Sequence, residues 1–162
     1  MAKIHELDQL DRQILAILMA DAKIPYTDIA RQLNVSGGTV HVRMKKLEET
    51  GIVEGARLQI DPSKLGYDII AFIGIFLEKS SLYEDVINRL MEIPEVINAY
   101  YTTGNYSIFT KVVCKDTRDL RIVLSEKIQA ITGIQRTETL IALEERIDRP
   151  IHLPVTDDEN HP

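Results

Sequence analysis

Positively charged side chains gather in one short stretch of this acidic chain. The 162 residues carry a net charge of -6, yet no Asp or Glu occurs between Ile29 and Leu47. The cationic side chains of that window, counting one histidine, are Arg31, His41, Arg43, Lys45 and Lys46. Clustered cations of this kind neutralise nucleic-acid phosphates, and an arginine can pair bidentately with the edge of guanine. The stretch predicts a DNA-binding surface, although a stable helix with a solvated charged face would show the same pattern.

Ser36 is a suitable N-cap for the helix that would carry these cations, because its hydroxyl can accept from the amides of the first turn. Small residues follow at Gly37, Gly38 and Thr39, and they would allow a close approach of the backbone to phosphates and bases. We expect a base-edge contact from Arg43. The expected phosphate contacts are Arg31, His41, Lys45 and Lys46.

A second group of polar side chains lies at residues 100–107, where the sequence YYTTGNYS combines hydroxyls, an amide and a glycine. An α-amino acid needs donors for its carboxylate and acceptors for its ammonium group, and a glycine-containing turn supplies both from the backbone. A plain hairpin of β-favouring Tyr and Thr explains the segment equally well. Gln129, within an otherwise apolar helix, could reach a ligand or face water.

Catalytic and metal-binding patterns are absent from the sequence. The four histidines are scattered, and no Ser-His-Asp order, phosphate loop or metal-ligand spacing occurs. The single cysteine, Cys114, cannot form an intramolecular disulfide, which fits a reducing cytoplasm. The longest apolar stretch, Ile69–Leu77, is too short to span a bilayer as a helix. We therefore expect a cytoplasmic protein that is not an enzyme, has no metal or cofactor, and does not enter a membrane.

The elements that would position the basic cluster are three short helices. Apolar spacing and caps predict helices over residues 7–22, 26–33 and 36–50, and Gly51 ends the third. Two helices joined by a short turn, the second one basic, form a helix-turn-helix that enters the major groove. Residues 52–60 favour extended structure and residues 61–63 a turn, so we expect a linker strand or hinge over 52–64.

The elements that would position the polar group alternate between strands and helices. Apolar periodicity and turn residues predict strand 67–77, helix 81–92, strands 96–103 and 106–114, helix 117–131 and strand 134–143. This βαββαβ order is that of a ferredoxin-like sandwich, so the fold class is α+β. The first strand is apolar on both faces, and one face needs a second copy, which predicts dimerisation. The expected parts are 1–51, 52–64, 65–144 and a frayed tail, 145–162.

These segments make the chain resemble the Lrp/AsnC family of feast/famine regulators over about residues 7–144. The stretches that carry the resemblance are LDQLD at 7–11, LNVS at 33–36 and GIV at 51–53. The asparagine-responsive branch of the family is more similar still, through GTVHVR at 38–43, LGYD at 65–68, AYYTTG at 99–104, YSIF at 106–109 and Gln129.

The resemblance implies a sequence-specific transcription regulator that binds double-stranded operator DNA. It also implies dimers that pair through their sheets, a homo-octamer, and an amino-acid effector, asparagine, bound in clefts between dimers. Carried over residue by residue, the effector site is Tyr83, Tyr101, Thr103, Gly104, Asn105, Ser107 and Gln129. Many members have Asp where this chain has Ser107, and the asparagine type has His where it has Asn105. Two alternatives stay open, an effector-blind architectural DNA-binding protein and an amino-acid-sensing regulatory subunit of an enzyme.

Overall fold

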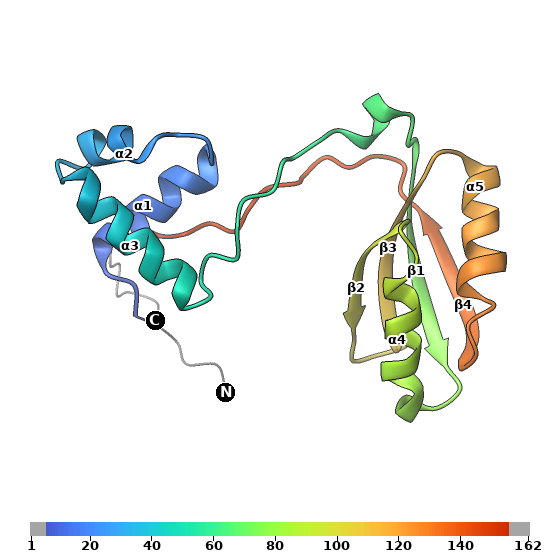
Figure 1. The fold of residues 1–162 in the computed structure, drawn as a ribbon. Coiled ribbons are helices and arrows are strands. Elements are labelled where there is room, and N and C mark those ends of the chain that lie inside the picture. The colour runs from blue at the N-terminus through green and yellow to red at the C-terminus, as the bar shows by residue number, and fades with distance from the viewer. Residues whose placement is uncertain (1–5, 156–162) are drawn as a thin grey trace, which may run out of the picture. The chain divides into compact units, whose positions relative to one another are not determined.

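The computed structural model describes residues 6–155, and the chain divides into two compact units (Figure 1). The first unit runs to Leu58 and also takes in the chain from Asp148 onward, whereas the second unit spans Gln59–Ile147. The chain therefore passes between the units twice, once after the third helix and once after the last strand. Each unit is described by itself.

Three helices form the first unit, and their bounds are α1 Gln9–Ala20, α2 Tyr26–Gln32 and α3 Gly37–Glu49. Asp8 caps α1 through a capping box, in which its carboxylate accepts from the amide of Asp11 at 2.9 Å. Ile14, Ile29 and Val40 are fully buried, one from each helix. The apolar stripe of each helix thus packs on the other two, as the spacing in the sequence predicts.

The turn between α2 and α3 is tight. Asn34 adopts a left-handed conformation (φ 54°), and the amide of Val35 donates to the carbonyl of Ala30 at 3.0 Å. Ser36 then caps α3, since its hydroxyl accepts from the amide of Thr39 at 3.0 Å. The predicted helix-turn-helix is confirmed.

The second unit is a four-stranded antiparallel sheet with two helices. Its elements are β1 Ile69–Leu77, α4 Tyr83–Met91, β2 Val96–Tyr101, β3 Ile108–Cys114, α5 Thr117–Ile122, continued by a π-helical segment Val123–Ile128, and β4 Ile134–Ile141. Short 3-10 turns lie at η1 Pro62–Leu65 and η2 Ser80–Leu82. The strand order β2-β3-β1-β4 is that of the expected ferredoxin-like sandwich. The α+β fold class is confirmed.

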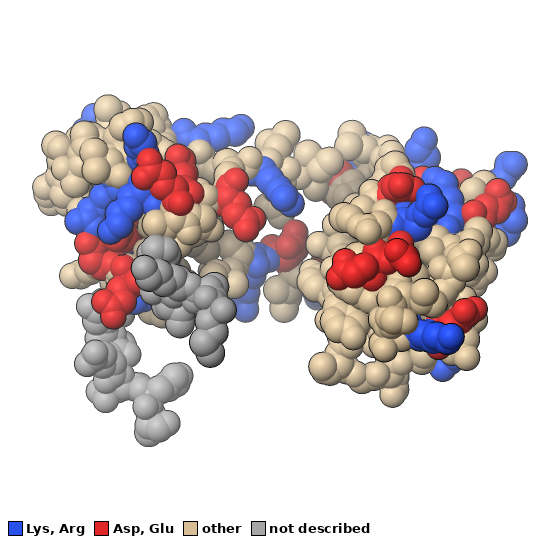
Figure 2. Space-filling model, turned by 60° about the horizontal axis from the view of Figure 1, so that its bottom comes forward, with Lys and Arg blue, Asp and Glu red and all other residues tan. Residues whose placement is uncertain are grey.

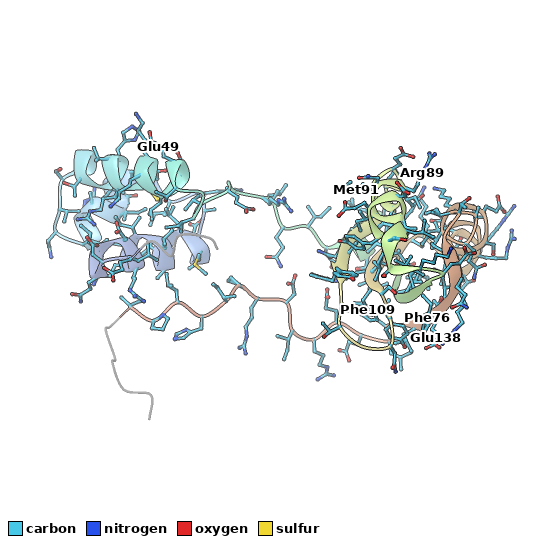
Figure 3. All side chains as sticks on the ribbon, turned by 90° about the horizontal axis from the view of Figure 1, so that it is seen from below. Glu49, Phe76, Arg89, Met91, Phe109 and Glu138 are labelled. Carbon is cyan, nitrogen blue, oxygen red and sulfur yellow. The ribbon has the colours of Figure 1, made fainter. Side chains whose placement is uncertain are left out.

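The core of the second unit lies between the sheet and its helices. Ala71 and Ile73 of β1 are fully buried against residues such as Leu90 of α4 and Val123 of the π-helical segment. The opposite face of the sheet carries no helix of this unit, and its aromatic side chains remain partly exposed. Figure 3 shows Phe76, Phe109 and Glu138 on that open face, away from Arg89 and Met91 of α4.

Three details of the sequence-based fold are wrong. Within the described residues no strand forms between α3 and β1, because a lone extended segment finds no second strand there to pair its amides and carbonyls. The apolar spacing of helix 81–92 predicts that Met91 points inward, yet Met91 is 71% exposed at the last position of α4. The tail is not frayed as far as Val155, because Leu153 packs against the core of the first unit. Residues 156–162 lie outside the described part.

Candidate DNA-binding and effector sites

One face of α3 is turned away from the core of the first unit. Val40, Met44 and Leu47 form the buried stripe, whereas most of the residues between them point outward. The exposed stripe, at helical spacings of three and four residues, consists of Gly38, His41, Val42, Lys45 and Glu49. Figure 3 shows Glu49 on the side of α3 that faces away from α1. This stripe, with Lys46 beside it, is the surface that α3 offers to a partner.

Most of the predicted DNA-binding cations are free to reach such a partner. His41, Lys45 and Lys46 are exposed on α3, and the ammonium of Lys45 lies 3.7 Å from the Glu49 carboxylate. Exposed pairs of this kind are weak, so a phosphate can compete for the lysine. Arg31 of α2 is 80% exposed and lies 3.1 Å from Asp28. Figure 2 shows basic and acidic side chains next to each other on the first unit, so the positive surface is local.

Arg43 reaches toward the start of α1, away from the exposed stripe of α3. Its guanidinium donates to the carboxylates of Asp8 and Asp11, at 2.9 Å to the latter, and only 31% of its side chain is exposed. The Asp11 side chain is 6% exposed. The hydrogen bond from Arg43 holds the pKa of the Asp8 carboxyl below its ordinary value, because it favours the charged form. The arginine joins α3 to the start of α1, which the sequence did not indicate.

Neither packing nor backbone conformation requires glycine at Gly37 and Gly38. A Cβ atom at Gly37 would meet nothing within 4 Å, and one at Gly38 would meet only the Ser36 hydroxyl at 3.7 Å. Neither has a positive φ angle. Glycine costs a helix up to about 1 kcal/mol relative to alanine. The first turn of α3 therefore carries no side chains at these two positions. The unpaired amides and the helix dipole favour an anion there.

The predicted effector residues divide into two groups. The first surrounds the β2–β3 hairpin, where the rings of Tyr83 and Tyr101 lie 4.4 Å apart between centroids. The loop is fixed by Thr102, whose amide donates to the Ser107 carbonyl at 3.1 Å and whose hydroxyl donates to the Tyr106 carbonyl at 2.6 Å. The loop residues Thr103, Gly104 and Asn105 are exposed, and Gly104 has a φ of 132°.

Gln129 lies at the other edge of the sheet. Its amide donates to the hydroxyl of Thr137 on β4 at 2.9 Å. The pairing Tyr101–Ile108–Ile75–Thr137 runs across all four strands, so Tyr101 and Thr137 share one face of the sheet. Three strand spacings separate them by about 14 Å. Tyr101 and Gln129 therefore lie at opposite edges of the sheet, whereas Ser107 lies nearer its middle, because the Ser107 amide donates to the carbonyl of Ile75 at 2.9 Å.

Sequence reasoning missed two residues of these sites. Val42 lies in the middle of the exposed stripe of α3, and the phase of the helix relative to Val40, Met44 and Leu47 was the signal for it. Thr137 is the partner of Gln129, and strand alternation alone could not reveal that contact. Among residues 6–155 no group of three His, Cys, Asp or Glu side chains could hold a metal ion. No helix in the same range is long and apolar enough to cross a membrane.

A helix-turn-helix with an exposed basic second helix, on one chain with an antiparallel α/β unit, defines a class of DNA-binding transcription regulators. Two family models match this chain. Residues 7–54 match a winged helix-turn-helix DNA-binding domain, and residues 70–151 match the Lrp/AsnC ligand binding domain.

Named relatives agree with these matches. The chain is 49% identical over 148 residues to the regulatory protein AsnC of Haemophilus influenzae, with 91% of this chain and 99% of that protein covered. It is 48% identical over 145 residues to the regulatory protein AsnC of Escherichia coli K12, covering 90% and 95%. The solved structure of E. coli AsnC superposes with a TM-score of 0.87 at 47% identity, covering 91% and 99%. The chain belongs to the Lrp/AsnC family and is a DNA-binding transcription regulator with an amino-acid-binding domain.

Proposed function

We propose that two copies of this chain bind palindromic operator DNA, each placing the exposed face of α3 in the major groove, and that asparagine modulates this binding. The observation that carries the DNA-binding surface is the bare, capped start of α3, followed by exposed His41, Lys45 and Lys46. Ser36, Gly37, Gly38 and Thr39 lie where a phosphate would meet the free amides of the first turn. Arg31 of α2 adds a cation near the same end of α3.

Arg43 takes another role in this proposal. Because its guanidinium already donates to Asp8 and Asp11, a base contact would require it to leave a partly buried ion pair. Arg43 instead holds α3 at a fixed position on α1, and the exposed side chains of α3 read the groove. This revises the role that the sequence predicts for Arg43.

The effector site lies between copies of the chain. Tyr101 and Thr137, the partner of Gln129, stand about 14 Å apart across one sheet. We expect an effector that contacts residues at both edges to use the hairpin of one copy and Gln129 of another. Dimers that pair through the open sheet face and assemble into an octamer would supply such clefts. The effector then shifts the assembly by binding it more tightly than the separate dimers.

Asparagine suits the uncharged polar lining of this site. Thr103, Asn105, Ser107 and Gln129 offer hydroxyl and amide groups, which can donate to and accept from a side-chain amide. Ser107, in place of the Asp of many family members, leaves a neutral group where a carboxylate would attract the effector's ammonium. The 49% identity to a regulatory protein AsnC supports the same choice.

DNA binding can be tested on duplexes that the full-length protein selects from a random library. Replacing both Lys45 and Lys46 with alanine should weaken binding and flatten its dependence on salt by about one unit of slope for each lost phosphate contact. Lys79→Ala, which removes an exposed lysine of the second unit, is the matched control. Equal salt slopes for all three proteins, measured by fluorescence anisotropy, would refute α3 as the phosphate-binding surface.

Effector binding can be tested by thermal shift against the twenty amino acids. A ligand that binds only the native state stabilises it by about 2.7 kcal/mol at a concentration of 100 times Kd. We expect a rise in Tm with asparagine, a lost rise in Gln129→Ala, and a retained rise in Ser125→Ala, which changes an exposed neighbour on the same helix. A wild-type protein that none of the amino acids stabilises would contradict an amino-acid effector and favour an architectural role.

A further inference from the structure

Val42 is an apolar side chain on the exposed stripe of a basic helix. It is 67% exposed, although Val40 and Met44, two positions away on either side, are buried. It follows Gly38 by four residues and precedes Lys45 by three, so the three positions lie along one side of α3. The valine therefore points toward the space that a partner of this helix would occupy.

The fold of the first unit does not require a valine at this position. Branching at Cβ lowers helix propensity, and a largely exposed side chain adds little to the core. Single exposed apolar residues are ordinary on protein surfaces, so exposure alone decides nothing. The position of Val42 is more informative. Val42 shares the exposed stripe with His41 and Lys45, in the second turn of the helix that would enter the major groove.

We propose that Val42 is a specificity-determining residue that contacts the 5-methyl group of a thymine in the major groove. This inference rests on the proposed DNA-binding function. The thymine methyl is the one apolar group that a base pair presents in that groove, and apolar side chains recognise it by contact. A valine side chain is short, so the helix must come close to the base. Gly38, one turn earlier on the same stripe, has no side chain to hold the helix away.

The test uses duplexes that the wild-type protein selects from a random library, with each thymine replaced in turn by uracil. Uracil lacks only the methyl group. We expect one uracil position per half-site to weaken wild-type binding about four-fold, the worth of one buried methyl group. Val42→Ala removes the contact from both half-sites, so it should weaken binding to the thymine duplex by about the square of that factor. It should show no further loss when uracil is added.

Two further variants keep the test selective. Val42→Thr keeps the shape of the side chain and one of its two methyl groups, so it should retain a larger part of the methyl-dependent affinity than Val42→Ala does. Met19→Ala, which truncates an exposed apolar residue of α1, should retain it. Alanine favours a helix at an exposed position, so Val42→Ala should fold, as circular dichroism can verify.

The outcomes separate this inference from the function on which it rests. Equal losses for Val42→Ala on thymine and uracil duplexes, or no uracil position that weakens the wild type, would overturn the methyl contact while DNA binding stands. A wild-type protein that enriches no sequence from the library would instead refute sequence-specific DNA binding itself.

Discussion

Arg43 shows how a basic residue of a recognition helix can serve the fold. Its guanidinium joins the carboxylates of Asp8 and Asp11 at the start of α1, and Asp11 is nearly buried. Arginine suits this position because its planar group presents several donors at once, whereas lysine offers a single charged point. Arg43 therefore adds to the apolar core in fixing the position of α3 on α1.

Arg43→Ala should destabilise the first unit by about 2 kcal/mol. This is less than the roughly 3–5 kcal/mol lost when a fully buried pair is broken, because Asp8 stays half exposed. The cause is the Asp11 carboxylate, left inside the unit without its cation. Urea unfolding followed by circular dichroism measures the change. Lys46→Ala, which removes an exposed cation from the same helix, should leave the free energy of unfolding nearly unchanged and is the control.

Acid should remove part of the stability that Arg43 contributes. The pKa of Asp8 is lowered from 3.8 in the folded chain, chiefly by the hydrogen bond from Arg43. Because the pKa of Asp8 is lower in the folded chain, its charged carboxylate stabilises the folded state above pH 3.8. This contribution is lost as the pH falls from 3.8 through the lowered pKa of Asp8. The difference in stability between wild type and Asp8→Asn should therefore shrink over that range. A difference that stays constant there would contradict the ion pair.

At the scale of the element, Gly74 of β1 leaves room for the Tyr106 ring on the open face of the sheet. A Cβ atom at Gly74 would lie 2.4 Å from the Tyr106 ring, which packs edge-on against Phe76 with 5.2 Å between ring centroids. The Tyr106 hydroxyl donates to Glu138 at 2.8 Å, and this hydrogen bond raises the pKa of the Tyr106 phenol. The missing side chain at Gly74 thus lets the hairpin fold back over the sheet.

Gly74→Ala should destabilise the second unit by about 1–3 kcal/mol, the usual range for overpacking. The reason is the clash with the Tyr106 ring, so the same substitution in a Tyr106→Ala background should cost little. A double-mutant cycle by urea unfolding measures the coupling. An equal cost in both backgrounds would show that the ring does not set the need for glycine.

At the scale of the whole molecule, the open face of the sheet is the surface that we propose for self-association. Phe72 and Phe109 stack there with 5.8 Å between ring centroids, and Leu140, the partner of Phe72 on β4, is 57% exposed. Exposed apolar surface of this kind marks an interaction site. A second copy of the same face would cover it.

Leu140→Asp should convert the protein to monomers at micromolar concentration while its fold is retained. Leu140 is mostly exposed within one chain, so the charge costs little until a second copy covers it. Sedimentation velocity measures the change. Met91→Asp places the same charge at an exposed position of α4 and should leave the assembly intact. Unchanged sedimentation of the Leu140 variant would contradict dimerisation through this face.

Local spacing in the sequence by itself determined the helices, the strands and their order. Caps such as Ser36 and apolar periods of two or 3.6 residues act within a few positions of the chain, so they can be read without the fold. The exposed lysines of α3 and the polar hairpin could be predicted for the same reason, and the resemblance to a known family added the expected function.

Only the tertiary structure decided which distant residues meet. Arg43 reaches Asp8 across 35 positions, and Leu153 returns to the core of the first unit from the far end of the chain. Tyr101 and Gln129 are placed at opposite edges of one sheet, although both carry polar groups suited to the same ligand. These placements follow from packing and strand order between residues far apart in sequence, which no local spacing encodes.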